Sequence, residues 1–313
     1  MGIHHITAIA GDPDRNLRFY ARTLGLRLVK LTVNYDDPAT YHFYFGDELG
    51  HPGTIVTFFP WPHGSPGRLG TGQVAAIAFA IPSASLGFWI ERLLSQGVRY
   101  QGPSRRFDEA VLAFADPDGL PLELIASDRA RDLPPWSEGP VPAEHAIRAL
   151  HGATIWEDGD TGTAELLGGE LGFRAVGEEG TVLRLQSGEG AGAVVDLRRA
   201  PGFWRGAGGV GTVHHIAFRS ADPADQLTGR AALEAAGYQV TPVLDRTYFR
   251  SVYFREPGGV LFEIATDGPG FTVDENPADL GSSLQLPATL EGMRDRLTAA
   301  LPSLALPSIF LQP

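Results

Sequence analysis

Cysteine is absent from this chain of 313 residues. Its absence excludes disulfide bonds, thiolate metal ligands and a cysteine nucleophile. No apolar run is long enough to cross a bilayer, and no charged and apolar leader follows Met1. We therefore expect a cytoplasmic protein with no membrane partner. Clusters of lysine and arginine are also lacking and the formal net charge is −12, which argues against nucleic acid as a partner.

Four segments of the chain repeat one order of elements. Each begins with a short strand, continues through a helical stretch to a glycine-containing turn, and ends in two or three further strands. Shared order, turn type and strand-opening residues favour duplication over ordinary β/α alternation. We call the segments modules one to four; they span residues 4–60, 74–127, 150–199 and 213–267.

The segment "RDLPPWSEGPVPAEH" between modules two and three is proline-rich and lacks periodicity, as interdomain linkers do. We therefore predict an N-terminal domain of residues 1–130 and a C-terminal domain of residues 146–268. Residues 269–313 would form a tail. Within that tail, "LPATLEGMRDRLTAALPSL" predicts one amphipathic helix that braces the body, with its apolar face formed by Leu290, Met293, Leu297 and Leu301.

Adjacent histidines open the first strands of modules one and four, in "IHHITAIA" and "VHHIAF". Because successive side chains of a strand point to opposite faces, only one histidine of each pair can face the interior of a curved sheet. His5 and His215 have small companions on their face, which leaves room for a ligand. We expect His4 and His214 to lie on the other face and to pack against helices.

A carboxylate interrupts the last strand of module four, at Glu263 in "VLFEIATD". Such a buried charge is costly unless it is paired or bound to a metal. Two imidazoles and one carboxylate are the ligands of the facial triad of non-haem Fe(II) oxygenases. Core histidines with a salt-bridged glutamate are the alternative, but matching module positions favour a metal site formed by His5, His215 and Glu263.

The duplicated βαβββ module resembles the vicinal oxygen chelate superfamily, which contains glyoxalases, bleomycin-resistance proteins and extradiol dioxygenases. Three longer stretches resemble its ring-cleaving hydroquinone dioxygenase branch: "HHITAIAGDPDRNLRFYARTLGLRLVK", "VNYDDPATYHFYFGDELGHPGTIVTFFPW" and "PGFTVDENPADLG". The resemblance implies an α+β fold of four βαβββ modules in two domains with curved mixed sheets, plus the C-terminal helix. It also implies that modules one and four form one site.

The same resemblance implies roles for individual residues. Its iron ligands fall on His5, His215 and Glu263, and its catalytic residues around the substrate fall on His4, Thr7, His214, Arg246 and Tyr253. Fe(II) is the implied cofactor, with Mn(II) or another divalent ion as the alternative. The implied partners are a small aromatic substrate and O2, while the formation of a homo-oligomer stays open.

Module one has Thr57 where glyoxalases of the lactoylglutathione type carry a fourth ligand. The missing ligand leaves coordination positions open for substrate and oxygen, which favours an oxygenase. In modules two and three we expect Glu123, His151 and Asp196 to form a vestigial site without metal, because module two has Ala76 at the histidine position.

The remaining histidines are expected to be structural. His42 either lines the pocket or packs among aromatic neighbours, while His51, His63 and His145 lie in turns or linkers and should be solvated. The predicted reaction is oxygen-dependent cleavage of a para-diol or a catechol. Two alternatives remain: a glyoxalase-type metal-dependent isomerase or lyase, and a metal-free protein that binds an aromatic compound.

Overall fold

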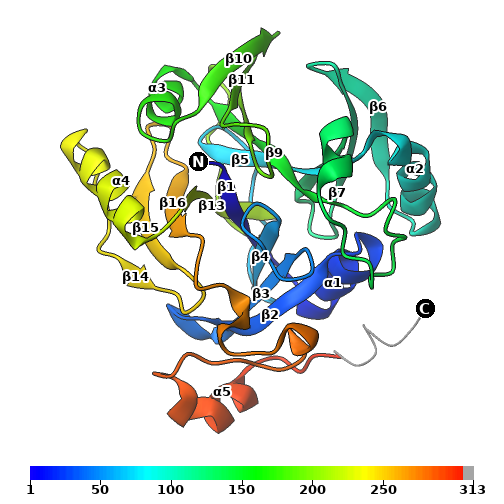
Figure 1. The fold of residues 1–313 in the computed structure, drawn as a ribbon, viewed down its shortest axis with the longest axis vertical. Coiled ribbons are helices and arrows are strands. Elements are labelled where there is room, and N and C mark those ends of the chain that lie inside the picture. The colour runs from blue at the N-terminus through cyan, green and yellow to red at the C-terminus, as the bar shows by residue number, and fades with distance from the viewer. Residues whose placement is uncertain (306–313) are drawn as a thin grey trace.

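The computed structural model describes residues 1–305, which form two curled sheets of eight strands each. Figure 1 shows the N-terminal strand near the middle of the molecule, with the helices toward the outside. The fold is α+β with few helices and a C-terminal helix, as the sequence predicts. No helix among the described residues is long and apolar enough to span a membrane.

The first sheet combines strands of modules one and four. Module one contributes the half from β1 to β2, and module four contributes the half from β14 to β13. In spatial order the strands are β14 (Leu244–Asp245), β15 (Arg250–Arg255), β16 (Leu261–Thr266), β13 (Thr212–Ser220), β1 (Ile3–Ala10), β4 (Ile55–Pro60), β3 (Asp37–Gly46) and β2 (Arg27–Asn34).

The second sheet combines modules two and three in the same way. In spatial order its strands are β10 (Arg174–Glu179), β11 (Val182–Gln186), β12 (Val194–Arg199), β9 (Ala149–Glu157), β5 (Gln73–Pro82), β8 (Pro121–Ser127), β7 (Glu109–Ala115) and β6 (Tyr100–Arg106). Each sheet therefore draws strands from both of the domains that the linker predicts. The division of the chain at residues 130 and 146 stays a prediction.

One helix or helical turn follows the opening strand of each module. In module one, α1 (Pro13–Leu17) continues into a π-helical segment (Arg18–Thr23). Aspartates cap α1 and α4: Asp12 and Asp222 accept hydrogen bonds from backbone N–H groups of the first turn. The other modules contain α2 (Leu86–Ser95), α3 (Thr161–Gly169) and α4 (Pro223–Ala235).

The predicted bracing helix is shorter than the pattern suggests. A 3₁₀ turn at Glu291–Met293 precedes α5, which spans only Arg294–Ala300. Leu297 and Leu301 are buried in the main core, and the Tyr41 hydroxyl on β3 donates to the Pro302 carbonyl oxygen at 2.9 Å. The tail therefore packs against the module-one end of the first sheet, next to β2 and β3 in Figure 1.

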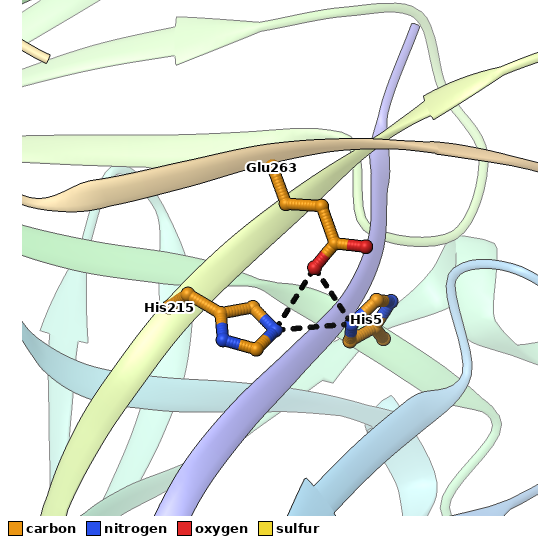
Figure 2. A group of neighbouring side chains, drawn as sticks. All are labelled: His5, His215 and Glu263. Atoms are coloured by element: carbon orange, nitrogen blue, oxygen red, sulfur yellow. Dashed lines mark hydrogen bonds and ion pairs between the residues drawn. The ribbon is translucent and has the colours of Figure 1, made fainter. Parts of the chain in front are cut away.

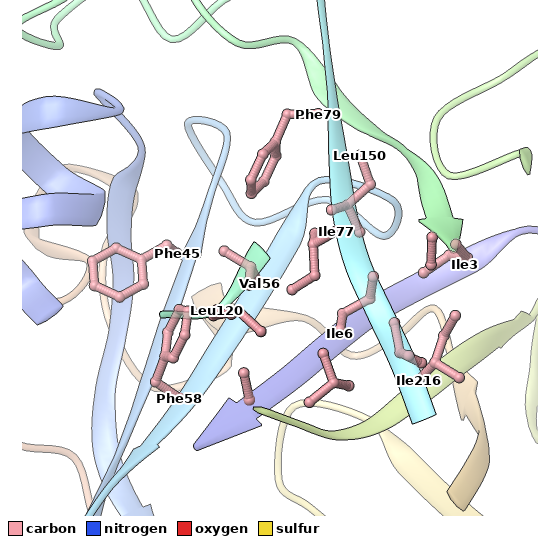
Figure 3. Close-up of a cluster of buried hydrophobic side chains, with 14 of the residues drawn as sticks. Ile3, Ile6, Phe45, Val56, Phe58, Ile77, Phe79, Leu120, Leu150 and Ile216 are labelled. Carbon is pink, nitrogen blue, oxygen red and sulfur yellow. The ribbon is translucent and has the colours of Figure 1, made fainter. Parts of the chain in front are cut away.

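The two sheets share one apolar core between the strands that open the modules. Ile3 and Ile6 on β1, Ile77 on β5 and Ile216 on β13 have no exposed surface, and Figure 3 shows them crowded together. Burying such side chains contributes about 1.5–3 kcal/mol each. This core fixes β1 and β13, the strands that carry both histidine pairs, at the middle of the molecule.

Candidate metal centre

Strand pairing places the two histidine pairs next to each other. β1 and β13 are antiparallel neighbours, and their register shifts at His4 on one strand and at His214 on the other. At each shift, two residues of one strand lie opposite a single residue of its partner, as in a β-bulge. Bulges change the direction of side chains, so simple alternation fails at both positions.

The prediction that His4 and His214 pack against helices on the back of the sheet is therefore wrong. His214 is exposed and lines the cavity beside His215, where its ring contacts Phe59 with 5.6 Å between centroids. His4 is buried, and its ring lies 5.1 Å from the same Phe249 ring that contacts His5.

The three predicted ligands meet at one point. His5 comes from β1, His215 from β13 and Glu263 from β16, and one donor atom of each lies within 4.8 Å of the others. Glu263 Oε2 is 3.0 Å from His215 Nε2 and 3.4 Å from His5 Nε2, while the two Nε2 atoms are 3.3 Å apart. Figure 2 shows all three side chains directed inward.

The second histidine of each pair holds the first in place. His4 Nδ1 lies 2.9 Å from His5 Nδ1, and His214 Nδ1 lies 2.8 Å from His215 Nδ1. These contacts occupy the Nδ1 atoms of His5 and His215, so their Nε2 atoms remain available to bind a metal. Partners of this kind orient ligating imidazoles and set their tautomers.

The electrostatics of the group suit a divalent cation. Burial alone would raise the pKa of Glu263, but His5 and His215 beside it hold that pKa well below its ordinary value. Burial lowers the pKa of His215, although Glu263 opposes the shift. Neutral imidazole and ionised carboxylate are the protonation states that ligation requires.

A buried oxygen atom that lacks a hydrogen bond is a further indication that the group suits a divalent cation. Glu263 Oε2 is buried and has no hydrogen bond of normal geometry among the described residues, while Oε1 accepts one from the Ser251 hydroxyl. A buried carboxylate oxygen without a donor is costly. A metal ion bound by these atoms would offset the charge of Glu263 and would account for the short distance between the two Nε2 atoms. The ligand atoms therefore fit a metal ion.

A cavity of about 320 Å³ opens onto the triad. Aromatic rings of Tyr35, Tyr44, Phe59 and Phe249 contribute to its wall, so its shape and polarity suit a flat ring. Of the residues that the resemblance implies, Arg246, Tyr253 and His214 line this cavity, whereas His4 and Thr7 are not among its lining residues.

Arg246 and Tyr253 form the module-four wall. The Tyr253 ring contacts His215 at 5.7 Å, and the Arg246 guanidinium lies 5.6 Å from the Tyr253 ring. Burial raises the pKa of Tyr253, and so does the charge of Glu263, so its hydroxyl stays protonated. Arg246 Nη2 also donates to Asp36 Oδ2 at 2.9 Å, and this exposed carboxylate was not identified from the sequence.

The second sheet has two guanidinium groups at the position of the triad. Arg106 donates from Nη1 and Nη2 to Glu123 at 3.0 and 2.6 Å, and Arg184 donates from Nε and Nη2 to Asp196 at 2.7 and 2.9 Å. Both carboxylates are thus bonded within the protein.

We expected His151 at the position in the second sheet that is equivalent to a metal ligand of the first sheet, and this prediction is wrong. Thr7 lies opposite His215 in the first sheet, and the equivalent Ala78 lies opposite Gly152 in the second. His151 sits at the register shift, where the first sheet has His214, and its Nε2 lies 2.8 Å from Glu109 Oε1. Module three therefore has glycine where module four has its metal ligand.

The other histidines partly follow the prediction. His63 is exposed, and His51 is exposed and paired with Asp47 at 2.7 Å. His145 is not solvated: it is half-buried, stacks on Phe88 at 4.3 Å and bonds the Ser85 hydroxyl at 3.1 Å. His42 lines the cavity. Its alternation with Tyr41 and Phe43 was the available signal, since it places His42 on the face of Tyr44.

Comparisons with known proteins find ring-cleaving dioxygenases among the relatives of this chain. The chain is 46% identical over 301 residues to "Putative ring-cleaving dioxygenase MhqO" of Bacillus subtilis, covering 96% of both chains. It is 38% identical over 307 residues to chlorohydroquinone/hydroquinone 1,2-dioxygenase of Sphingobium indicum, covering 95% of this chain and 94% of that protein. A crystal structure from B. subtilis matches with a TM-score of 0.94 at 46% identity, over 98% of each chain.

The sequence profile of one superfamily matches two segments, residues 2–124 and 164–264, which together include most of all four modules. Both segments contain strands of the first sheet, and Glu263 lies within the second of them. The chain belongs to the Glyoxalase/Bleomycin resistance protein/Dioxygenase superfamily.

Proposed function

We propose that the protein is an Fe(II)-dependent ring-cleaving dioxygenase that opens a hydroquinone-type or catechol-type ring with O2. The observation that carries this proposal is a set of two histidines and one glutamate at the base of an aromatic-lined cavity. Three protein ligands leave coordination positions open. The hydroquinone dioxygenase of S. indicum supports the choice of a para-diol.

His5, His215 and Glu263 would hold the metal. When bound, Fe(II) supplies Lewis acidity toward a phenolic oxygen and one-electron chemistry toward O2. The protein would supply an aromatic-lined cavity that orients the ring, and both oxygen atoms of O2 would be retained in an extradiol-type ring-opened product.

Residues of module four would handle protons and charge. Tyr253 and Arg246 offer donors beside His215, where oxygen atoms gain negative charge during the reaction. Desolvation and the neighbouring His215 lower the pKa of His214 to about 4, so its imidazole is neutral at pH 7. If His215 binds the metal through Nε2, its Nδ1–H donates to His214 Nδ1, so the neutral His214 carries its proton on Nε2 and would donate it toward an oxygen atom of the substrate or of O2.

The test is oxygen uptake by protein loaded anaerobically with Fe(II) and then mixed with hydroquinones, catechols and O2. We expect one O2 consumed per diol, an acyclic product, and incorporation of both atoms of labelled O2. Quinone formation without ring opening, or no uptake with any diol, would refute the proposal.

The same experiment separates the two alternatives. A glyoxalase-type isomerase would convert its substrate without O2, and a metal-free binding protein would need no metal. Thr57 lies opposite Thr7, as Glu123 lies opposite the equivalent Ala78 in the second sheet, so module one lacks a fourth carboxylate ligand. This observation favours the oxygenase.

A further inference from the structure

His42 occupies a defined place on the module-one wall of the cavity. Its ring lies 4.0 Å from the Tyr44 ring and 4.3 Å from the Phe59 ring, measured between centroids. Burial lowers the pKa of His42 well below its ordinary value, and the nearby His5 and His215 lower it further. The imidazole is therefore neutral and held between two aromatic side chains.

A row of hydrogen bonds fixes one nitrogen of this ring. His42 Nε2 lies 2.8 Å from Thr57 Oγ1, and Thr57 Oγ1 lies 2.7 Å from Thr7 Oγ1. Thr7 in turn lies opposite His215 across the β1–β13 pair. The row thus crosses from β3 through β4 to β1 and ends beside the metal ligands, and it orients the imidazole before any ligand arrives.

The other nitrogen is free to meet a ligand. His42 Nδ1 makes no hydrogen bond to the residues that the structure describes, yet the side chain lines the cavity. A neutral imidazole with one nitrogen engaged offers the other as a donor or an acceptor, according to its tautomer. A hydroxyl group of a ligand can satisfy either form.

Two other polar atoms on this wall already make hydrogen bonds within the protein. Asn34 Oδ1 accepts from the Asp36 backbone N–H at 3.0 Å, and the Tyr35 hydroxyl donates to Thr247 Oγ1 at 3.0 Å. The Tyr44 hydroxyl and the Trp61 indole N–H also lie on this wall, and neither has a hydrogen-bond partner among residues 1–305. His42 differs from Tyr44 in that the threonine row holds it in position.

We propose that His42 is a specificity-determining residue, whose Nδ1 binds the hydroxyl of the diol on the side of the ring opposite the hydroxyl held at the triad. This inference deepens the proposed function and rests on it for the class of ligand. The module-four wall then serves the reacting end of the ring, and the module-one wall recognises the far end. His42 would thereby select a para-diol over a monophenol.

The test compares the binding of hydroquinone and phenol to Fe(II)-loaded protein without O2, by calorimetry. Phenol lacks only the second hydroxyl, so the ratio of its Kd to that of hydroquinone isolates the contribution of that group. We expect a ratio of about 10 in the natural protein, the size of one good hydrogen bond. His42→Phe keeps an aromatic ring and should bring the ratio to about 1, with the Kd of phenol changed little.

Three further variants control the comparison. His42→Gln can bond Thr57 and still offer a polar atom, so it should restore part of the ratio. His145→Phe removes a matched histidine that is also stacked on an aromatic ring and bonded to a hydroxyl, but lies outside the cavity; its ratio should stay about 10. Tyr44→Phe should also keep the ratio.

An unchanged ratio in His42→Phe, a loss of the ratio only in Tyr44→Phe, or no preference for hydroquinone in the natural protein would each overturn the inference. The proposed function fails separately. If the natural protein prefers hydroquinone through His42 but consumes no O2, the recognition by His42 stands and the dioxygenase activity does not.

Discussion

Replacing Glu263 by glutamine removes the charge of the triad while keeping its shape. In the metal-free protein the amide oxygen can still accept from Ser251, and the amide nitrogen can donate to one of the neighbouring Nε2 atoms. The loss of stability without metal should therefore be about 1 kcal/mol or less, the net value of one hydrogen bond. A purely structural glutamate would show this effect and no other.

The loss of stability caused by Glu263→Gln should be larger in the presence of metal than in its absence. Changes to groups that merely orient a ligand weaken metal binding by about 10- to 100-fold, and a lost ligand charge should reach at least the upper value. At a metal concentration of 100 times the natural Kd, binding stabilises the folded state by about 2.7 kcal/mol. A 100-fold weaker site retains only about 0.4 kcal/mol under the same conditions, so the variant should lose about 2.3 kcal/mol of metal-dependent stability.

Urea unfolding with and without Fe(II), together with metal content and O2 uptake, measures these quantities. Glu123→Gln is the matched control, because Glu123 pairs with Arg106 in the second sheet and should lose equal stability in both conditions. If Glu263→Gln keeps natural metal affinity and near-normal O2 uptake, Glu263 is not a ligand and the main reason for assigning an oxygenase is removed.

Three further substitutions test the surrounding structure. Lys30 is fully buried and paired with Asp274 and Glu275 of the tail, so Lys30→Met should cost about 3–5 kcal/mol in urea unfolding; a loss below 1 kcal/mol would show that these pairs do not hold the tail. Burial and the charge of Glu256 raise the pKa of Glu157 to about 8, so folded protein keeps a proton there that unfolded protein releases, and stability falls as pH rises from about 4.5 to 8. The Tm gained by Glu157→Gln should therefore be larger at pH 8 than at pH 5, and an equal gain at both would contradict the shift. Arg184→Met should destabilise the second sheet without raising metal content above that of the natural protein, because Ala76 and Gly152 supply no imidazole there; a second bound metal would disprove this account.

The sequence predicts the ligands because their chemistry is local. A glutamate within an apolar strand and histidines at two strand starts already limit what those residues can do. The adjacency of β1 and β13 cannot be derived from spacing, since it depends on how modules one and four pair across the whole chain. That adjacency was inferred from the resemblance, and the structure shows it.

The errors at His4, His214 and His151 have one physical cause. Each of these residues sits at a register shift, where one strand has an extra residue against its neighbour. A strand cannot reveal a bulge by its own alternation, because a bulge is a property of two paired strands. The same bulges supply the Nδ1 contacts that hold His5 and His215, so the feature that the sequence concealed is part of the site.

Comparison of the two sheets explains why only one of them has a triad suited to a metal. Arg106 precedes Glu123 by the same number of residues as Arg246 precedes Glu263, so the two arginines occupy equivalent places. In the second sheet Arg106 binds its carboxylate directly, and Arg184 adds a second cation at Asp196. In the first sheet Asp36 binds Arg246 instead, and Ser251 and the two imidazoles are left around Glu263. One sheet thus neutralises these two carboxylates with guanidinium groups, whereas the other keeps a buried carboxylate that has no lysine or arginine partner among the described residues and whose charge a bound cation would offset.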